Sequence, residues 1–262
     1  MMQRILTAIL AVAIFLPFVI IGGLPFTLFI YLLATIALYE LLRMKNISVQ
    51  TFPGVLSLIL IWVLLFPSTT LDFMTDVNVS KVEIALLAVV FLLSYTVITK
   101  NKFTFDDAAF VILATIYIGI GFYYFIETSD KGLKYLFFAM FVIWATDSGA
   151  YFVGRAVGKR KLWPEISPNK TIEGSIGGVI CALIVAIIFQ FFLPITDSFF
   201  KMLLITVLLS IFGQMGDLVE SALKRHYDVK DSGTILPGHG GILDRFDSLL
   251  FVLPIFHFLQ FV

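Results

Sequence analysis

A stripe of ionisable and hydroxyl side chains follows an apolar stretch in the last quarter of the sequence. Asp217, Glu220, Ser221 and Lys224 are spaced i, i+3, i+4 and i+7, which places them on one face of a helix. Such a face could hold a magnesium ion that carries a polyphosphate, because Mg²⁺ takes one or two carboxylates plus phosphate oxygens and lysine neutralises phosphate charge. An ordinary intrahelical ion pair at a membrane surface is the alternative.

A glycine-rich turn and a second acidic cluster follow this stripe. The turn is Pro237-Gly238-His239-Gly240-Gly241, and Asp244, Arg245 and Asp247 come almost directly after it. Because glycines let backbone N–H groups approach an anion closely, we expect the turn to bind phosphate. A flexible connection before a helix is the alternative. Residues 217–247 hold six of the 18 acidic and four of the 18 basic residues, a density that favours a functional site beside a membrane.

A third group of polar residues lies upstream. Asp147, Tyr151 and Arg155 share a helical face at i, i+4 and i+8, and Lys170 lies in the polar segment that follows. Asp147 comes after a mostly apolar run, so it either belongs to the site or serves as a structural partner of Arg155. The spacing of Gly174 and Gly178 is typical of helix–helix contact in membranes.

The chain that carries these residues is too apolar to be soluble in water. Of its 262 residues 60% are apolar and only 14% are charged, and the mean hydropathy is +1.01, whereas about a quarter of a soluble domain is charged. Continuous apolar runs exclude a β-barrel, whose strands alternate. The single cysteine, Cys181, excludes an internal disulfide framework and a cysteine-based zinc site.

Nine apolar runs predict an all-α polytopic membrane protein with about nine transmembrane helices, since about 20 apolar residues cross a bilayer. Eight of the runs cover residues 5–22, 24–39, 52–71, 84–99, 108–126, 174–196, 202–216 and 248–262, and the sixth run along the chain starts at residue 135 and meets Asp147 before it is finished. We expect the first run to be retained rather than cleaved, because no A-x-A site follows it.

The distribution of Lys and Arg predicts the sidedness of these spans. With the N-terminus in the cytoplasm and the C-terminus outside, 14 of the 18 basic residues fall on the cytoplasmic side, as the positive-inside rule requires. We expect one membrane domain over 1–262, with spans that carry no motif in 1–130 and catalytic spans in 131–262. The catalytic part has cytoplasmic loops at 155–173 and 217–247.

The segment from Ser221 to Asp247 resembles the hallmark of the phosphatidate cytidylyltransferases, which are the CDP-diacylglycerol synthases. Every fixed position of the 27-residue pattern is filled: Ser221, Lys224, Arg225, Lys230, Asp231, Gly233, Leu236, Pro237, His239, Gly240, Gly241, Asp244, Arg245 and Asp247. The segments 147–155 and 167–174 look like the family's upstream cytoplasmic motifs.

The resemblance implies a nucleotidyltransferase that converts CTP and phosphatidate to CDP-diacylglycerol and pyrophosphate with Mg²⁺, and that forms a homodimer. A phosphate monoester is largely ionised at neutral pH, so the reaction needs positioning and charge neutralisation rather than a strong base. The residues implied to bind metal are Asp217 and Asp244. Those with catalytic roles are Ser221, Lys224, Arg225 and Asp247. Those that bind substrate are Asp147, Tyr151, Arg155, Lys170, Lys230, His239, Gly240, Gly241 and Arg245.

The expected location is a bacterial plasma membrane, with the active site facing the cytoplasm. CTP would enter from water and phosphatidate from the leaflet. The last apolar run of 15 residues extends about 22 Å, which is shorter than the hydrocarbon core of about 30 Å. Asp244 and Asp247 are therefore expected in a water-filled pit below the headgroups.

Two other kinds of function remain as alternatives. One is a different CTP-dependent lipid phosphotransferase or a lipid kinase, which would release CDP instead of pyrophosphate. The D-G-x-x-A-R motif of CDP-alcohol phosphotransferases is absent from the sequence. The other is a transporter, but the ionisable residues gather at one membrane face rather than at the midplane, and no repeated halves are visible.

Overall fold

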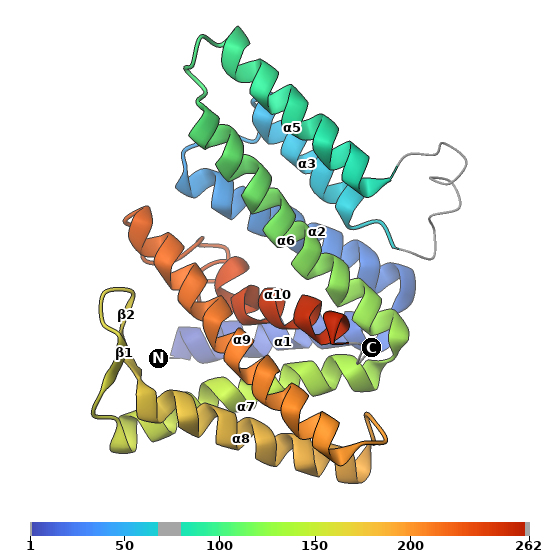
Figure 1. Ribbon diagram of the computed structural model, residues 1–262, viewed down its shortest axis with the longest axis vertical. Helices are drawn as coiled ribbons and strands as arrows, with labels where there is room; N and C mark the ends of the chain where they lie inside the picture. Colours follow the sequence, from blue (N-terminus) through green and yellow to red (C-terminus); the bar gives the residue numbers. More distant parts are fainter. Residues whose placement is uncertain (1, 68–79, 260–262) are drawn as a thin grey trace. The chain divides into compact units, whose positions relative to one another are not determined.

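The computed structural model of the chain describes residues 2–67 and 80–259, with side chains from Leu6 onward (Figure 1). These residues form nine helices and one short antiparallel sheet. Six of the helices in this part are long and apolar enough to cross a membrane. The predicted all-α membrane class is confirmed, while the exact number of spans and their sidedness stay predictions.

The elements group into two compact units. The first unit comprises the chain up to Glu127 and the later segment Ser232–Ile242. In it α2 packs against α1 and α3, and α3 packs against α5. Its helices are α1 (Met2–Ile21), α2 (Gly23–Met44), α3 (Phe52–Leu64), α5 (Lys81–Ile98) and most of α6 (Phe105–Lys131).

The start of α5 differs from the expected start of the fourth apolar run, at residue 84. The helix begins at Lys81 because Ser80 and Glu83 form a capping box, in which the Ser80 Oγ accepts the Glu83 N–H at 3.2 Å and the Glu83 carboxylate accepts the Ser80 N–H at 2.6 Å. The Lys81 ammonium donates to the carbonyl oxygen of Leu64, at the end of α3, at 3.0 Å. The expected end of the third run, Leu71, lies outside the described residues.

The second unit comprises residues 128–231 and 243–262. Its elements are α7 (Leu133–Val157), β1 (Lys161–Trp163), β2 (Ser167–Thr171), α8 (Ile172–Phe192), α9 (Phe199–His226) and α10 (Leu243–Phe258). The segment 217–247 was expected as a cytoplasmic loop whose first residues continue the eighth apolar run as a helix, and the structure has helix at residues 217–226 and 243–247, with the residues between them outside helices. The helix α9 continues well past Gly216, and α10 begins before Ser248, so both carry acidic residues on helical turns.

Glycines let α7 and α8 approach each other closely. Gly174 and Gly178 are buried on α8. A Cβ on Gly174 would lie 2.7 Å from the backbone oxygen of Ala150, and a Cβ on Gly178 would lie 2.7 Å from that of Thr146. Both distances are below contact, so the small residues are required by the packing of the two helices, as their spacing predicted.

Replacing Gly178 with leucine should therefore force α7 away from α8. We expect the free energy of unfolding to fall by about 1–3 kcal/mol, the usual cost of overpacking, when it is measured by thermal unfolding in detergent. Ile180→Leu is the matched control, because Ile180 lies on the same helix with 53% of its surface exposed. Equal stability of the two variants would contradict the packing role of Gly178.

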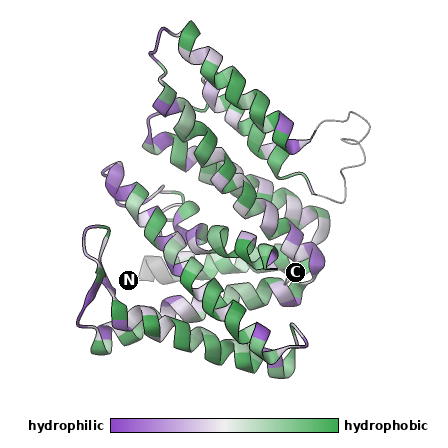
Figure 2. Cartoon of the chain, in the orientation of Figure 1, coloured by the Kyte–Doolittle hydropathy of each residue, from purple (hydrophilic) through white to green (hydrophobic). Residues whose placement is uncertain are grey.

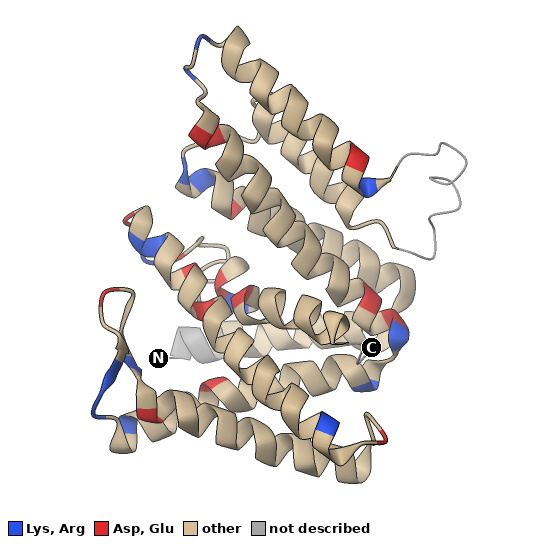
Figure 3. Cartoon of the chain, in the orientation of Figure 1, with Lys and Arg blue, Asp and Glu red and all other residues tan. Residues whose placement is uncertain are grey.

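The outer surfaces of the helices are apolar, which fits a lipid environment. Figure 2 shows hydrophobic residues around the helices of both units, and side chains such as Val97 and Phe191 are 76% and 82% exposed. Exposure of apolar surface to water costs about 25 cal/mol per Å², and acyl chains remove that cost. Figure 3 shows most charged residues near helix ends or in the connections between helices.

A β-hairpin in the connection between α7 and α8 was not predicted. The strands β1 and β2 pair antiparallel after α7 has ended at Val157. The carboxylate of Glu173, in the first turn of α8, accepts the backbone N–H groups of Lys159 at 3.0 Å and Arg160 at 3.1 Å. This carboxylate therefore holds the residues that precede β1 close to the start of α8, which follows β2.

Candidate active site

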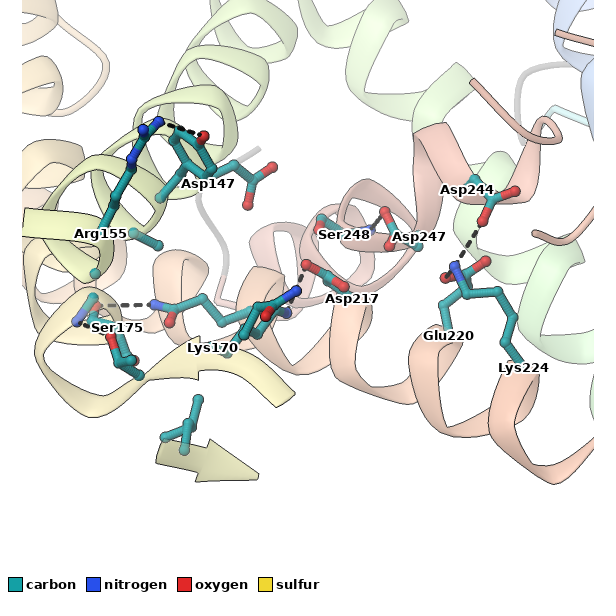
Figure 4. Close-up of a pocket in the computed structure, with 18 of the residues that line it drawn as sticks. Asp147, Arg155, Lys170, Ser175, Asp217, Glu220, Lys224, Asp244, Asp247 and Ser248 are labelled. Carbon is teal, nitrogen blue, oxygen red and sulfur yellow. Dashed lines mark hydrogen bonds and ion pairs between the residues drawn. The ribbon is translucent and has the colours of Figure 1, made fainter. Parts of the chain in front are cut away.

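A cavity of about 640 Å³ lies within the second unit, bordered by α7, the hairpin, α8, α9 and α10 (Figure 4). Its volume is in the range of small-molecule binding sites. Nine of the predicted site residues line it: Asp147, Tyr151, Arg155, Lys170, Asp217, Lys224, Asp244, Arg245 and Asp247. The structure thus brings predicted residues from three separate helices, α7, α9 and α10, and from the strand β2 to a common polar cavity.

Lys224 is the most enclosed cation of this cavity. Its Nζ lies 2.7 Å from the Oδ1 of Asp244 on α10, and it also forms an ion pair with Glu220 one turn earlier on α9. The exposed fractions of the three side chains are 15% for Lys224, 4% for Asp244 and 1% for Glu220. The intrahelical pair considered from the sequence is present, but it is extended by a second helix and lines the cavity.

A second ion pair joins the hairpin to α9. The Nζ of Lys170, on β2, lies 2.6 Å from the Oδ2 of Asp217. The hydroxyl of Ser221, one turn later on α9, donates to the Oδ1 of Asp217 at 3.3 Å. Ser221 itself does not line the cavity, so its contact with the site is through the Asp217 carboxylate.

Three carboxylates of the cavity repel one another. Asp147 interacts unfavourably with Asp217, and Asp247 interacts unfavourably with both. Lys170 and Arg245 offset part of this repulsion at Asp147, and Lys224 offsets part of it at Asp247. A concentration of negative charge of this kind attracts cations.

The carboxylates fit a hard divalent cation in their chemistry. Oxygen ligands are what Mg²⁺ prefers, and the buried Oε1 of Glu220 has no hydrogen-bond partner among the described residues. As the side chains stand, Asp217 and Asp244 instead face Lys170 and Lys224. No three His, Cys, Asp or Glu residues converge on one point within residues 2–67 and 80–259.

The Arg155 side chain forms a hydrogen bond with a residue one turn earlier on the same helix, α7. Its Nη1 donates to the hydroxyl of Tyr151 at 3.3 Å. An Arg155–Asp147 ion pair, the structural alternative considered for Asp147, is not among the ion pairs of the described residues. Asp147 therefore lines the cavity together with the other acidic residues, and it does not pair with Arg155 at the end of α7.

Six predicted residues do not line the cavity. Besides Ser221, the second unit contains Arg225, whose Nε donates to the carbonyl of Ile166 at 3.4 Å, and Lys230, which is exposed. His239, Gly240 and Gly241 belong to the first unit, in the segment Ser232–Ile242. Their roles in substrate binding stay predictions.

Several residues of the cavity had no role assigned from the sequence. Glu220 stood on the recognised stripe but was given no function, although it is the buried partner of Lys224. Gln214 lies three residues before Asp217, and its Nε2 donates to the carbonyl of Ser175 at 3.4 Å. A polar amide inside an apolar run is a signal that could have been used. The remaining lining residues with polar side chains are Asn169, Thr171, Ser175 and Ser248.

Comparison with known proteins decides the family. The family model described as "Cytidylyltransferase family" matches residues 2–262. The chain belongs to the cytidylyltransferase family. This confirms the resemblance found in residues 221–247, and it identifies the protein as a membrane enzyme.

Relatives of this cytidylyltransferase-family chain carry a common name. The chain is 60% identical over 262 residues to the phosphatidate cytidylyltransferase of Bacillus subtilis (strain 168), with 99% of this chain and 97% of the relative covered. It is 53% identical to that of Staphylococcus haemolyticus (strain JCSC1435) and 48% identical to that of Staphylococcus aureus (strain COL), each over 260 residues, 99% of this chain and 98% of the relative. The similarity therefore extends well beyond the motif.

Proposed function

We propose that this enzyme transfers CMP from CTP to phosphatidate, which yields CDP-diacylglycerol and pyrophosphate. The observation that carries the proposal is the cavity of the second unit, in which Lys170, Lys224, Arg155 and Arg245 stand among carboxylates on a scaffold with exposed apolar surfaces. The names of the relatives agree with this reaction.

The residues supply what this reaction requires. A phosphate oxygen of phosphatidate attacks the α-phosphorus of CTP, and the bond from that phosphorus to the oxygen bridging the β-phosphate breaks, so that pyrophosphate leaves. The nucleophile is already ionised, so no side chain must remove a proton from it. Lys224 and Arg245 neutralise charge near the phosphates, and Lys170 and Arg155 orient them.

Mg²⁺ is proposed at Asp217 and Asp244. When bound, it would supply positive charge to the phosphate oxygens. The carboxylates now paired with Lys170 and Lys224 would then be shared between cation and lysine. Ser221 would keep Asp217 oriented through its hydrogen bond, and Asp247 would add negative charge that favours the cation.

A product assay with purified enzyme tests the reaction and the metal separately. With CTP labelled at the α-phosphate, phosphatidate and Mg²⁺, we expect labelled CDP-diacylglycerol and one pyrophosphate per product. EDTA should abolish product formation, and added Mg²⁺ should restore it. Release of CDP with a phosphorylated lipid would indicate a kinase, and unchanged label crossing sealed vesicles would indicate a transporter. Turnover that resists EDTA would contradict the metal proposal alone.

We further propose that the enzyme is a homodimer in a bacterial plasma membrane, with the cavity open to the cytoplasm. Bacterial relatives and the apolar helices support this location. Externally added CTP should be consumed only by inside-out vesicles; consumption by right-side-out vesicles would contradict the orientation. Light scattering of the detergent-solubilised protein, with the detergent mass subtracted, should give twice 29.4 kDa, and the mass of a single chain would contradict the dimer.

A further inference from the structure

Glu40 is a buried carboxylate on α2, in the first unit, far along the chain from every motif. Its exposed fraction is 3%. Its Oε2 accepts a hydrogen bond from the Ser232 hydroxyl at 3.1 Å, and its Oε1 accepts the backbone N–H of Ile242 at 2.9 Å. A buried carboxylate is costly unless such bonds compensate it. One side chain therefore holds both ends of the segment Ser232–Ile242, which we call the glycine loop.

Two glycines of this loop are explained by backbone conformation. Gly238 has φ 78° and Gly240 has φ 81°, a region that favours glycine. Leu236 accepts the N–H of His239 at 2.8 Å, so Leu236 to His239 form a type II turn with Pro237 and Gly238 at its centre. The loop is thus an ordered turn rather than a flexible connection.

The other two glycines are explained by Glu40. Gly233 and Gly241 do not have positive φ. A Cβ on either one would overlap the Glu40 Oε1, and a Cβ on Gly241 would also overlap the Ser232 hydroxyl. Glycine at these positions leaves room for the carboxylate. The Glu40 carboxylate can therefore occupy its position only because residues 233 and 241 are glycines.

We propose that Glu40 is a positioning residue for catalysis, whose carboxylate serves as an internal anion around which the glycine loop folds. The Ile242 N–H is donated to this carboxylate. Ile242 is two residues before Asp244 in the sequence, so the bond fixes the chain just before the acidic turn of α10. A carboxylate that accepts backbone N–H groups forms stronger hydrogen bonds than a neutral acceptor. The inference rests on the proposed function for its activity readout.

Three variants of Glu40 test the inference in the full-length enzyme. Glu40→Ala should lower kcat for CDP-diacylglycerol formation about a hundredfold, as misplaced catalytic groups do, with a smaller change in KM for CTP. Glu40→Gln, which keeps one oxygen for the Ile242 N–H, should lose only about tenfold. Hydrogen exchange of the Ile242 amide should be faster in Glu40→Ala than in the wild type. If Glu40→Ala does not fold, Glu40→Asp replaces it in these measurements, because the shorter side chain of aspartate withdraws the carboxylate from the loop.

A double-mutant cycle separates the specific role of Glu40 from a general loss of packing in the first unit. Gly241→Ala should lower kcat about a hundredfold in the wild type, but less than about threefold further in the Glu40→Ala or Glu40→Asp background, since coupled contacts are not additive. Gly119→Ala is the steric control, because its Cβ would press on Leu64 at 2.9 Å in the same unit. Asp107→Asn is the charge control, because it loosens the 3.3 Å pair with Lys45. Both controls should keep activity within about twofold.

Opposite results would overturn the inference. Wild-type kcat in Glu40→Ala, unchanged exchange at the Ile242 amide, or fully additive costs in the cycle would each do so. Absence of CDP-diacylglycerol from the wild-type enzyme would instead refute the proposed function. In that case the exchange measurement still decides whether Glu40 orders the glycine loop.

Discussion

Replacing Lys224 with methionine is expected to abolish turnover and to lower the free energy of unfolding by about 3–5 kcal/mol, the cost of leaving buried charge without its partner. Glu220 and Asp244 are only 1% and 4% exposed, and the Lys224 ammonium lies between them. The variant therefore leaves two shielded carboxylates that repel each other. Thermal unfolding in detergent measures the stability, and the CDP-diacylglycerol assay measures turnover.

A second substitution separates the two effects of Lys224. In Lys224→Met/Glu220→Gln one buried charge is removed, so most of the stability should return while activity stays lost. Lys201→Met is the matched control on the same helix, because Lys201 is exposed, and it should be neutral to within about 0.5 kcal/mol. Full turnover in Lys224→Met would refute the placement of this lysine at the phosphates.

Replacing Asp244 with asparagine is expected to lower kcat about a thousandfold and to raise the Mg²⁺ concentration needed for half-maximal activity. The asparagine oxygen can still accept the hydrogen bond that Lys224 now donates at 2.7 Å, so the protein should remain folded. The expected loss arises because the amide cannot supply the negative charge that a cation requires. A Mg²⁺ titration of product formation measures both effects.

The control for this variant is Asp228→Asn. Asp228 is exposed, and it has φ 52°, a conformation that asparagine tolerates as well as aspartate. It should retain wild-type kcat and the same Mg²⁺ requirement. If Asp244→Asn behaved like this control, the assignment of Asp244 to the metal would be wrong.

The helices were predictable from the sequence because a continuous apolar run in a membrane must satisfy its backbone hydrogen bonds internally, which a helix does. The errors lie where charged residues belong to helices. Lys81 and Glu83 were placed before the fourth span, although capping makes them part of α5. The helical face of Asp147, Tyr151 and Arg155 was predicted correctly, because α7 continues to Val157 and these residues line the cavity.

The site was predictable as a set of residues but not as a set of contacts. Helical spacing correctly joined Asp217 to Ser221 and Glu220 to Lys224. It could not show that Lys170 pairs with Asp217 or that Asp244 meets Lys224, because those contacts cross between elements. Glu40 gave even less signal. Its partners lie 192 and 202 residues away, and periodicity carries no information over such separations.

The dependence of the glycine loop on α2 has a consequence for how the protein is made. Synthesis proceeds at about 5–20 residues per second, so Ser232 and Ile242 leave the ribosome roughly 10–40 s after Glu40. Throughout that interval α2 is inserted without the two bonds that later compensate its acid. A charged residue at the centre of an inserting helix costs about 2.5–3.5 kcal/mol; Glu40 lies four residues before the end of α2, so its cost is below this value, and the apolar residues of α2 must outweigh it. The apolar length of α2 thus serves biogenesis before the carboxylate serves the finished enzyme.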